Sequence, residues 1–299
     1  MTGFRSGFAC LVGRPNAGKS TLVNALVGHK VAITSTRPQT TRHTVRGVVH
    51  RPDGQLVVVD TPGLHRPRTL LGERLNDLVR TTWTEVDVIA LCVPADERVG
   101  PGDRLIAAEV ARLSTPVVAV VTKSDLVDRS ALAAQLVAVA GLGDWAEVVP
   151  VSAVQDHQVG LLADLLVARL PEGPPLYPAG ELTDAPEEVL VAELVREAAL
   201  EGVRDELPHS LAATVEEMVP RADRPADRPL LDVRVTLYVE RPSQKAIVIG
   251  SGGSRLRAVG TAARRQIEAL LGTPVFLDLH VTVAKDWQRD PRQLRRLGF

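Results

Sequence analysis

The stretch "FACLVGRPNAGKSTLVNALVG", residues 8–28, constrains the fold more than any other part of the chain. Within it, "GRPNAGKS" (13–20) fits the pattern G-x-x-x-x-G-K-[ST], follows an apolar run and opens a helical pattern. In that context the backbone N–H groups of the turn wrap a phosphate, and the amino end of the next helix adds positive potential. We therefore expect a phosphate-binding loop at the carboxyl end of a β-strand.

Residues 7–170 continue this alternation of strand and helix. The apolar runs "VVHRP", "QLVVVDTPG", "VIALCVP", "PVVAVVTKSD" and "EVVPVSA" predict further strands, and helices are expected over 18–28, 102–113, 130–140 and 157–170. Several runs are apolar throughout, which is typical of strands covered on both faces. The pattern predicts an α/β domain with a mostly parallel sheet.

The order of elements changes after the proline-rich stretch "LPEGPPLYPAGELTDAP" (170–186), which is typical of a linker. A helix over 187–203 is expected first, followed by strands at "LAATVEEMV", "LLDVRVTLYVE" and "KAIVIG", a helix over 254–271 and a strand at "VFLDLHVTVA". We predict a first domain over 1–172, a linker over 173–186, and a compact α+β domain with a basic C-terminal tail over 187–299.

Composition sets only broad limits. The chain has 299 residues, 45% of them hydrophobic and 24% charged, which is the profile of a globular protein. Cys10 and Cys92 stand in apolar runs without metal-site or disulfide spacing, so we expect reduced core thiols. No leader is visible, and no apolar run approaches the roughly 18 residues of a membrane span. The predicted location is the cytoplasm.

The first glycine turn has the side chains that a bound nucleotide requires. Lys19 is expected to reach the β- and γ-phosphates, and Ser20 to offer a hydroxyl to Mg²⁺. Asp60, after an apolar strand, would hold Mg²⁺ through water, and the Gly63 N–H would sense the γ-phosphate. The remaining backbone contacts are assigned to Gly13, Arg14, Pro15, Asn16, Ala17, Gly18 and Thr21.

Two later strand ends predict the base. In "VVTKSD", Thr122 and Lys123 precede Asp125, whose carboxylate can accept hydrogen bonds from guanine N1–H and its 2-amino group; adenine offers neither. In "VPVSA", Ser152 precedes Ala153, whose N–H is placed to bond guanine O6. Each segment alone is better interpreted as a polar strand end. Together, at the carboxyl ends of successive strands, they indicate a guanine nucleotide site.

This constellation resembles the Ras-like GTPases of the translation-factor class. Their guanine motif has Asn where this chain has Thr122, so weaker bracing of the loops is expected. The stretch "TSTRPQTTRHTVRG" resembles switch I, with Thr41 capping Mg²⁺ and the γ-phosphate and Thr40 as the alternative. Leu64 replaces the water-orienting glutamine, which implies slow hydrolysis. Asn16 is either part of a K⁺ site or a turn-stabilising residue. The residues assigned to catalysis are Lys19, Thr41 and Gly63.

A second glycine turn, "VIGSGGSR", occupies residues 248–255. Gly250-Ser251-Gly252-Gly253 fits G-x-x-G, an apolar strand or short helix leads into it, and a helix follows. No Lys-Ser or Lys-Thr pair comes after the last glycine, so this turn is a poor nucleotide loop. It matches the clamp of a KH domain, which holds about four nucleotides of single-stranded nucleic acid.

The charge distribution supports a nucleic-acid partner. From Arg241 onward the chain carries eleven cations against four anions, although its overall net charge is −1. A positive field around the turn suits a phosphate backbone, with Lys245, Arg255 and Arg257 as the nearest cations. The alternative is a solvated basic helix face.

A GTPase domain followed by one KH-like domain resembles the Era family of ribosome-assembly GTPases. The resemblance extends over nearly the whole chain, through "GRPNAGKSTLVNALVG", "QTTRHTVRG", "DTPGLH", "LPEGPPLYP", "VIGSGG" and "VAKDWQRDPRQLRRLGF". It implies a type II KH fold, GTP, GDP and Mg²⁺ as ligands, and GTP-dependent binding near the 3′ end of 16S ribosomal RNA during assembly of the 30S subunit. It also implies contact of some members with the inner face of the membrane.

Two departures from the family pattern stand out. Ser251 and Gly252 lie where the family usually has a basic residue between glycines, and "VQDHQVG" lacks the usual glycine. The second hypothesis is a GTPase whose basic module binds anionic lipid or a protein partner. The third is a static RNA-binding protein with a vestigial nucleotide site, and the intact motif residues argue against it. We expect a monomer that does not bind DNA.

Overall fold

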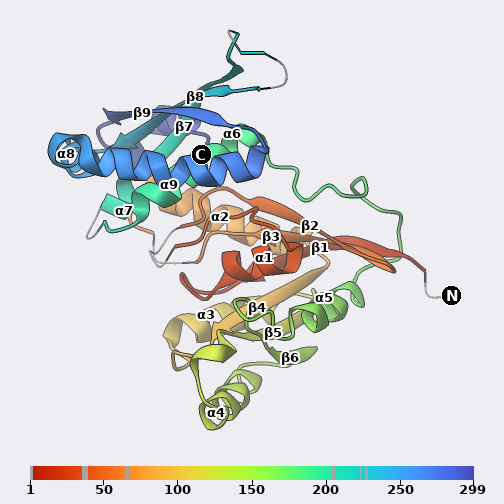
Figure 1. Ribbon diagram of the computed structural model, residues 1–299. Coiled ribbons are helices and arrows are strands. Elements are labelled where there is room, and N and C mark those ends of the chain that lie inside the picture. The colour runs from red at the N-terminus through yellow and green to blue at the C-terminus, as the bar shows by residue number, and fades with distance from the viewer. Residues whose placement is uncertain (1–2, 36–39, 65–66, 204–206, 223, 226–227) are drawn as a thin grey trace. The chain divides into compact units, whose positions relative to one another are not determined.

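The computed structural model describes residues 3–35, 40–64, 67–203, 207–222, 224–225 and 228–299 (Figure 1). Part of the stretch predicted as switch I, 36–39, lies outside these residues. Contacts divide the chain into two compact units. The first comprises Met1–Thr34, Thr41–Pro67 and Gly72–Asp184, and the second Ser35–Thr40, Arg68–Leu71 and Ala185–Phe299.

The first unit is built on a six-stranded sheet in the order β2-β3-β1-β4-β5-β6. The strands are β1 (Arg5–Val12), β2 (Val45–Arg51), β3 (Gly54–Asp60), β4 (Val88–Pro94), β5 (Val117–Thr122) and β6 (Glu147–Pro150). Only the edge strand β2 runs antiparallel, to β3, and every other pairing is parallel. The predicted, mostly parallel sheet is confirmed.

Helices cover both faces of this sheet. They are α1 (Lys19–Val27), α2 (Leu70–Glu85), α3 (Pro101–Val110), α4 (Arg129–Ala140) and α5 (Val159–Val167). Because side chains alternate along a strand, Ala9 and Leu11 of β1 pack in the core with α1 and α5, and Cys10 and Val12 in the core with α2, α3 and α4. The crossovers therefore leave the carboxyl ends of the parallel strands at one edge, where the predicted nucleotide residues follow them.

The segment predicted to be a linker follows the edge strand β2 up to Asp184. The buried Gln55 side chain accepts hydrogen bonds from the N–H groups of Leu176 (2.6 Å) and Tyr177 (2.9 Å). Val48 N–H donates to the Leu182 carbonyl at 2.9 Å. The Val48 bond satisfies a backbone group of the otherwise open edge strand, and the three bonds together place the segment with the first unit.

The second unit contains a three-stranded sheet in the order β7-β8-β9. Its elements are α6 (Glu187–Leu200), α7 (Leu207–Ser210), β7 (Ala212–Pro220), β8 (Leu231–Val239), α8 (Pro242–Ile249), α9 (Ser254–Leu271), β9 (Val275–Val283) and α10 (Pro291–Arg296). β7 is antiparallel to β8, and β9 is parallel to it. Helices α6 and α9 contact each other, with α6 against β7 and α9 against β9 (Figure 1).

The prediction of a strand at "KAIVIG" is wrong, because residues 245–249 belong to α8 and Gly250 caps it. The helix begins with Pro242, and the Gln244 side chain accepts hydrogen bonds from the N–H groups of Glu240 (2.9 Å) and Arg241 (3.0 Å). Proline in the first turn and a side chain that caps the preceding N–H groups start a helix despite the β-branched residues that follow. The alternative prediction for these residues, a short helix leading into the glycine turn, is confirmed.

The basic C-terminal tail is folded against the second unit. Trp287 is fully buried, donates its indole N–H to the Ser210 carbonyl at 2.9 Å, and stacks on Phe299 with ring centroids 5.7 Å apart. Leu294 of α10 is also buried. The tail's arginines are therefore carried on an ordered element.

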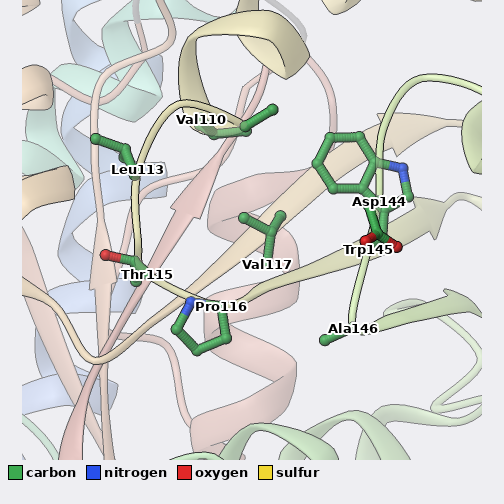
Figure 2. Close-up of a pocket in the computed structure, with 9 residues that line it drawn as sticks. Val110, Leu113, Thr115, Pro116, Val117, Asp144, Trp145 and Ala146 are labelled. Atoms are coloured by element: carbon green, nitrogen blue, oxygen red, sulfur yellow. The ribbon is translucent and has the colours of Figure 1, made fainter.

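The hollows within the described parts of the units include one in each unit. One, of about 310 Å³, opens at the amino end of β5 in the first unit (Figure 2) and is lined by Val110, Ala111, Leu113, Thr115, Pro116, Val117, Asp144, Trp145 and Ala146. Another, of about 530 Å³, lies on the sheet of the second unit and is lined by Glu216, Arg234, Thr236, Tyr238, Asp278, His280, Thr282 and Arg296. Neither includes a residue predicted to bind nucleotide or RNA. Among the described residues, no helix is long and apolar enough to cross a membrane.

Candidate functional site

The first glycine turn joins β1 to α1. Gly13 packs so tightly on β4 that a Cβ there would lie 2.5 Å from the Cys92 carbonyl oxygen. The ammonium of Lys19, the first residue of α1, donates to the carbonyls of Gly13 (3.1 Å) and Arg14 (2.9 Å) across the turn. Burial lowers the pKa of Lys19, and the nearby Asp60 charge opposes that shift. Its ammonium is thus held inside a narrow loop of backbone amides.

Three predicted metal ligands converge beside this loop. The Ser20 hydroxyl lies 2.7 Å from Asp60 Oδ2 and 2.9 Å from the Thr41 hydroxyl, and Thr41 donates to the same carboxylate oxygen at 3.0 Å. Burial raises the pKa of Asp60, while the bonds from Ser20 and Thr41 and the Lys19 charge oppose that rise.

The same cluster has a vacant acceptor. Asp60 Oδ1 is buried and has no hydrogen-bond partner. One orphaned carboxylate oxygen beside two hydroxyls is a donor set suited to a hard divalent cation such as Mg²⁺. Thr41, which we preferred over Thr40, is the threonine that completes this cluster; contacts group Thr40 with the second unit.

Thr122, at the end of β5, braces the phosphate loop. It is buried, and its hydroxyl donates to the Ala17 carbonyl at 2.7 Å. The expected loss of bracing at this position is therefore limited, because a hydroxyl supplies a direct bond between the guanine motif and the turn.

The residues assigned to guanine recognition lie close together at the ends of β5 and β6. Asp125, in the short helix η1 (Ser124–Leu126), is half-buried. Ser124 N–H donates to the Val151 carbonyl at 3.2 Å, which ties this loop to the segment that carries Ser152 and Ala153. The Ser152 hydroxyl accepts a bond from Gln155 N–H at 3.1 Å. The two segments can therefore act on one base.

Gly63 and Leu64 follow β3. A Cβ on Gly63 would lie 2.8 Å from the backbone nitrogen of Pro15, so the residue is pressed against the phosphate loop where the γ-phosphate would be sensed. Leu64 packs against the apolar cluster shared by α2, α3 and α4. An aliphatic side chain directed there cannot orient water by hydrogen bonding, in agreement with the slow hydrolysis that we expect.

The second glycine turn joins two helices. α8 ends at Ile249 and is capped by Gly250, η2 (Ser251–Gly253) forms the turn, and α9 begins at Ser254. Gly250, Gly252 and Gly253 have φ values of 72°, 55° and 76°, a conformation that L side chains rarely adopt. A Cβ on Gly252 would meet nothing within 4 Å, so the crest of the turn is open to a ligand backbone.

The three cations assigned to RNA occupy different positions around this turn. Arg255 is engaged within the fold, because its guanidinium donates to the carbonyls of Ala199 (3.2 Å) and Glu201 (2.5 Å) at the end of α6. Lys245 is half-buried on α8, and Arg257 is exposed on α9, with its guanidinium beside Gly253. Arg257 and Lys245 are therefore better placed for a ligand than Arg255.

Sequence reasoning missed an acidic loop next to the nucleotide residues. The Arg14 guanidinium pairs with Asp103 and Glu97, and Lys123 pairs with Asp96. Arg14 was assigned only a backbone role. The stretch "ADERVGPGD" (95–103) contains no motif, and only the fold brings its carboxylates to the two nucleotide loops.

Together, a phosphate loop, a metal-ligand cluster and a guanine motif at the carboxyl ends of a mostly parallel sheet define the first unit as a P-loop GTPase domain. Helix–glycine turn–helix on a three-stranded sheet defines the second as a KH domain. A family model described as "50S ribosome-binding GTPase" matches residues 8–123, and one described as "KH domain" matches residues 206–288.

Comparison of whole chains is more specific. The sequence is 72% identical to GTPase Era of Streptomyces coelicolor, over 99% of this chain and 95% of that protein, and 68% identical to GTPase Era of Mycobacterium avium over 100% of both. A crystal structure of Era with MgGDPNP and nucleotides 1506–1542 of 16S ribosomal RNA matches with a TM-score of 0.93 at 35% identity, covering 99% of both chains. The chain belongs to the Era family of GTPases.

Proposed function

We propose that this protein binds and hydrolyses GTP and uses the nucleotide state to control binding to small-subunit ribosomal RNA near its 3′ end during assembly of the 30S subunit. The observation that carries the proposal is the joint presence of two glycine turns with different chemistry. The first is followed by Lys19 and Ser20 and has Asp60 and Thr41 beside it; the second has none of these groups, but an open backbone and neighbouring cations.

The proposed nucleotide ligands are GTP and GDP with Mg²⁺, which would be held by Ser20, Thr41 and Asp60. The convergence of their oxygens and the orphaned Asp60 Oδ1 support that set. Lys19 and the Gly63 N–H would stabilise charge on the phosphates, and Asp125 and Ala153 would select guanine. The related Era crystallised with MgGDPNP supports the choice of nucleotide and metal.

A potassium ion beside the phosphates would supply positive charge of the kind that an arginine finger supplies in other GTPases. Asn16 has a left-handed backbone, with φ 63°, inside the phosphate loop. We propose that its side chain contributes to a K⁺ site beside the phosphates. Hydrolysis should then be faster in KCl than in NaCl at equal ionic strength, and Asn16→Ala should remove the difference. Equal rates in the two salts would leave Asn16 as a turn residue only.

The proposed RNA site consists of Gly250, Ser251, Gly252 and Gly253 with Lys245 and Arg257, while Arg255 supports the turn from within. A fragment corresponding to the 16S nucleotides in the related crystal structure is the natural probe. We propose action in the cytoplasm as a monomer, with a transient approach to the inner face of the membrane through the same cations.

The test is to crosslink the full chain to total RNA, once with GTP and once with GDP, and to sequence the RNA that is recovered. GTP hydrolysis is then measured with and without that RNA. The proposal expects enrichment of the 3′ end of 16S ribosomal RNA in one nucleotide state. Enrichment of no RNA, together with retention on vesicles containing anionic lipid, would support the lipid-binding alternative instead. RNA binding without any hydrolysis would support a static RNA-binding protein.

A further inference from the structure

Residues 95–103, which comprise the loop after β4 and the first three residues of α3, reach two separate nucleotide segments. We name this segment the acidic loop. Arg14, in the phosphate loop, places its Nε 2.7 Å from Asp103 Oδ1 and a terminal nitrogen 3.2 Å from Glu97. Lys123, in the guanine motif, places its ammonium 3.1 Å from Asp96. One loop thus holds a cation from each side of the nucleotide site.

Among the three carboxylates, Asp103 makes the firmest contacts. Its side chain is 1% exposed, so the carboxylate is removed from water and depends on its partners. Oδ1 accepts from Arg14, and Oδ2 accepts from Gly100 N–H at 2.8 Å, which caps the start of α3. A single buried carboxylate therefore links the phosphate loop to a helix of the scaffold.

The acidic loop is itself anchored at its base. The buried Gln135 of α4 donates to the carbonyls of Pro94 and Glu97, both at 2.9 Å. Ala95 N–H donates to the Thr122 carbonyl at 2.8 Å. The carboxylates are carried by a segment fixed to β5 and α4, which is what a positioning element requires.

We propose that Asp96, Glu97 and Asp103 are positioning residues for a guanine nucleotide. Through Lys123 and Arg14, they hold the guanine motif and the phosphate loop at the separation that one bound nucleotide needs. The inference rests on the proposed function, because it concerns the same site. When the two loops are already held in place, binding of the nucleotide does not have to order them, and less binding free energy is lost. Asp96 and Glu97 are partly exposed and their pairs are individually weak, so the larger effect is assigned to Asp103.

The decisive variant is Asp103→Asn, which retains an oxygen for Gly100 N–H but removes the charge that faces Arg14. We expect fluorescently labelled GDP, chased with unlabelled GDP, to dissociate about tenfold faster than from the original protein, which corresponds to about 1.4 kcal/mol. The matched control is Asp144→Asn, an exposed carboxylate at the opposite end of the sheet, with an unchanged dissociation rate.

A double-mutant cycle separates positioning from simple capping of α3. In an Arg14→Ala background, Asp103→Asn should no longer accelerate GDP release, because its effect passes through Arg14. Likewise Asp96→Asn should be silent in a Lys123→Ala background. Additive effects on release would show that the carboxylates act only on fold stability, and would overturn the inference.

The two proposals fail differently. If the original protein does not retain GDP, the proposed function is wrong. If it retains GDP and Asp103→Asn folds but releases it at the original rate, only the positioning role is wrong. Should Asp103→Asn fail to fold, Asp96→Asn and Glu97→Gln, whose carboxylates are partly exposed, are measured together; unchanged release from that double variant would overturn the inference.

Discussion

Thr122→Val tests how the guanine motif supports the phosphate loop. Valine retains the shape of threonine but removes the hydroxyl that donates to the Ala17 carbonyl at 2.7 Å. Thr122 is 4% exposed and Ala17 1%, so water cannot replace the lost donor. Leaving a buried acceptor without its partner costs about 1–3 kcal/mol. This corresponds to about 5- to 150-fold in an equilibrium constant.

The assay compares GDP affinity by fluorescence titration with urea unfolding of the nucleotide-free protein. We expect weaker GDP binding, a lower unfolding midpoint, or both, with the total loss in the range above. Thr122→Ser is the matched control, because it retains the hydroxyl and should keep most of the affinity. If Thr122→Val binds GDP within a factor of two of the original protein at an unchanged midpoint, this bond does not brace the site.

Three further outcomes follow from single residues. Asp125→Asn should weaken GTP by more than tenfold and favour xanthosine triphosphate, measured by competition; unchanged GTP affinity would refute its role in base selection. The Asp128 side chain caps α4 by accepting a hydrogen bond from Ala131 N–H at 2.8 Å. Asp128→Ala should therefore lower the free energy of unfolding by about 1 kcal/mol, and the control Arg129→Ala should leave it unchanged. Burial raises the pKa of Cys10 and of Cys92 to about 12. At pH 8 the folded protein should therefore not react with a thiol-specific disulfide reagent, whereas the unfolded protein should be labelled at both cysteines. Prompt labelling of the folded protein would contradict the buried placement.

Much of the fold follows from local sequence patterns. Runs such as "VIALCVP" are apolar throughout because β4 is covered on both faces, and their carboxyl ends carry the nucleotide residues for topological reasons. The helix over Leu70–Glu85 was not among those that we predicted, although Leu71, Leu75, Val79 and Trp83 recur every fourth position and are buried. That spacing was a sufficient signal for a helix.

Short apolar runs were the less predictable part. "KAIVIG" fits a strand or a helix equally well by its apolar pattern, and the information that decides it lies upstream, in Pro242 and Gln244. A capping side chain that bonds to the preceding backbone therefore predicts the helix better than the secondary-structure propensity of the apolar run does.

The site was predictable where chemistry is local and unpredictable where it depends on distant pairs. The phosphate loop carries its function in eight consecutive residues. By contrast, the bond from Thr122 to Ala17 and the pair of Arg14 with Asp103 join residues far apart in sequence, and no spacing encodes them. Arg255, which looked like an RNA contact from its place beside the glycine turn, is engaged with the end of α6 because the fold brings those carbonyls to it.

The most direct measurement compares two variants for binding to GDP and to an oligoribonucleotide that matches the 3′ end of 16S ribosomal RNA. The account predicts that Gly252→Asp combined with Gly253→Asp, once shown to be folded by circular dichroism, loses the oligoribonucleotide and retains GDP. It predicts loss of GDP for Lys19→Ala, in which the second glycine turn is unchanged. Displacement of GDP by the oligoribonucleotide from one shared site, or undiminished RNA binding by the double glycine variant, would contradict it.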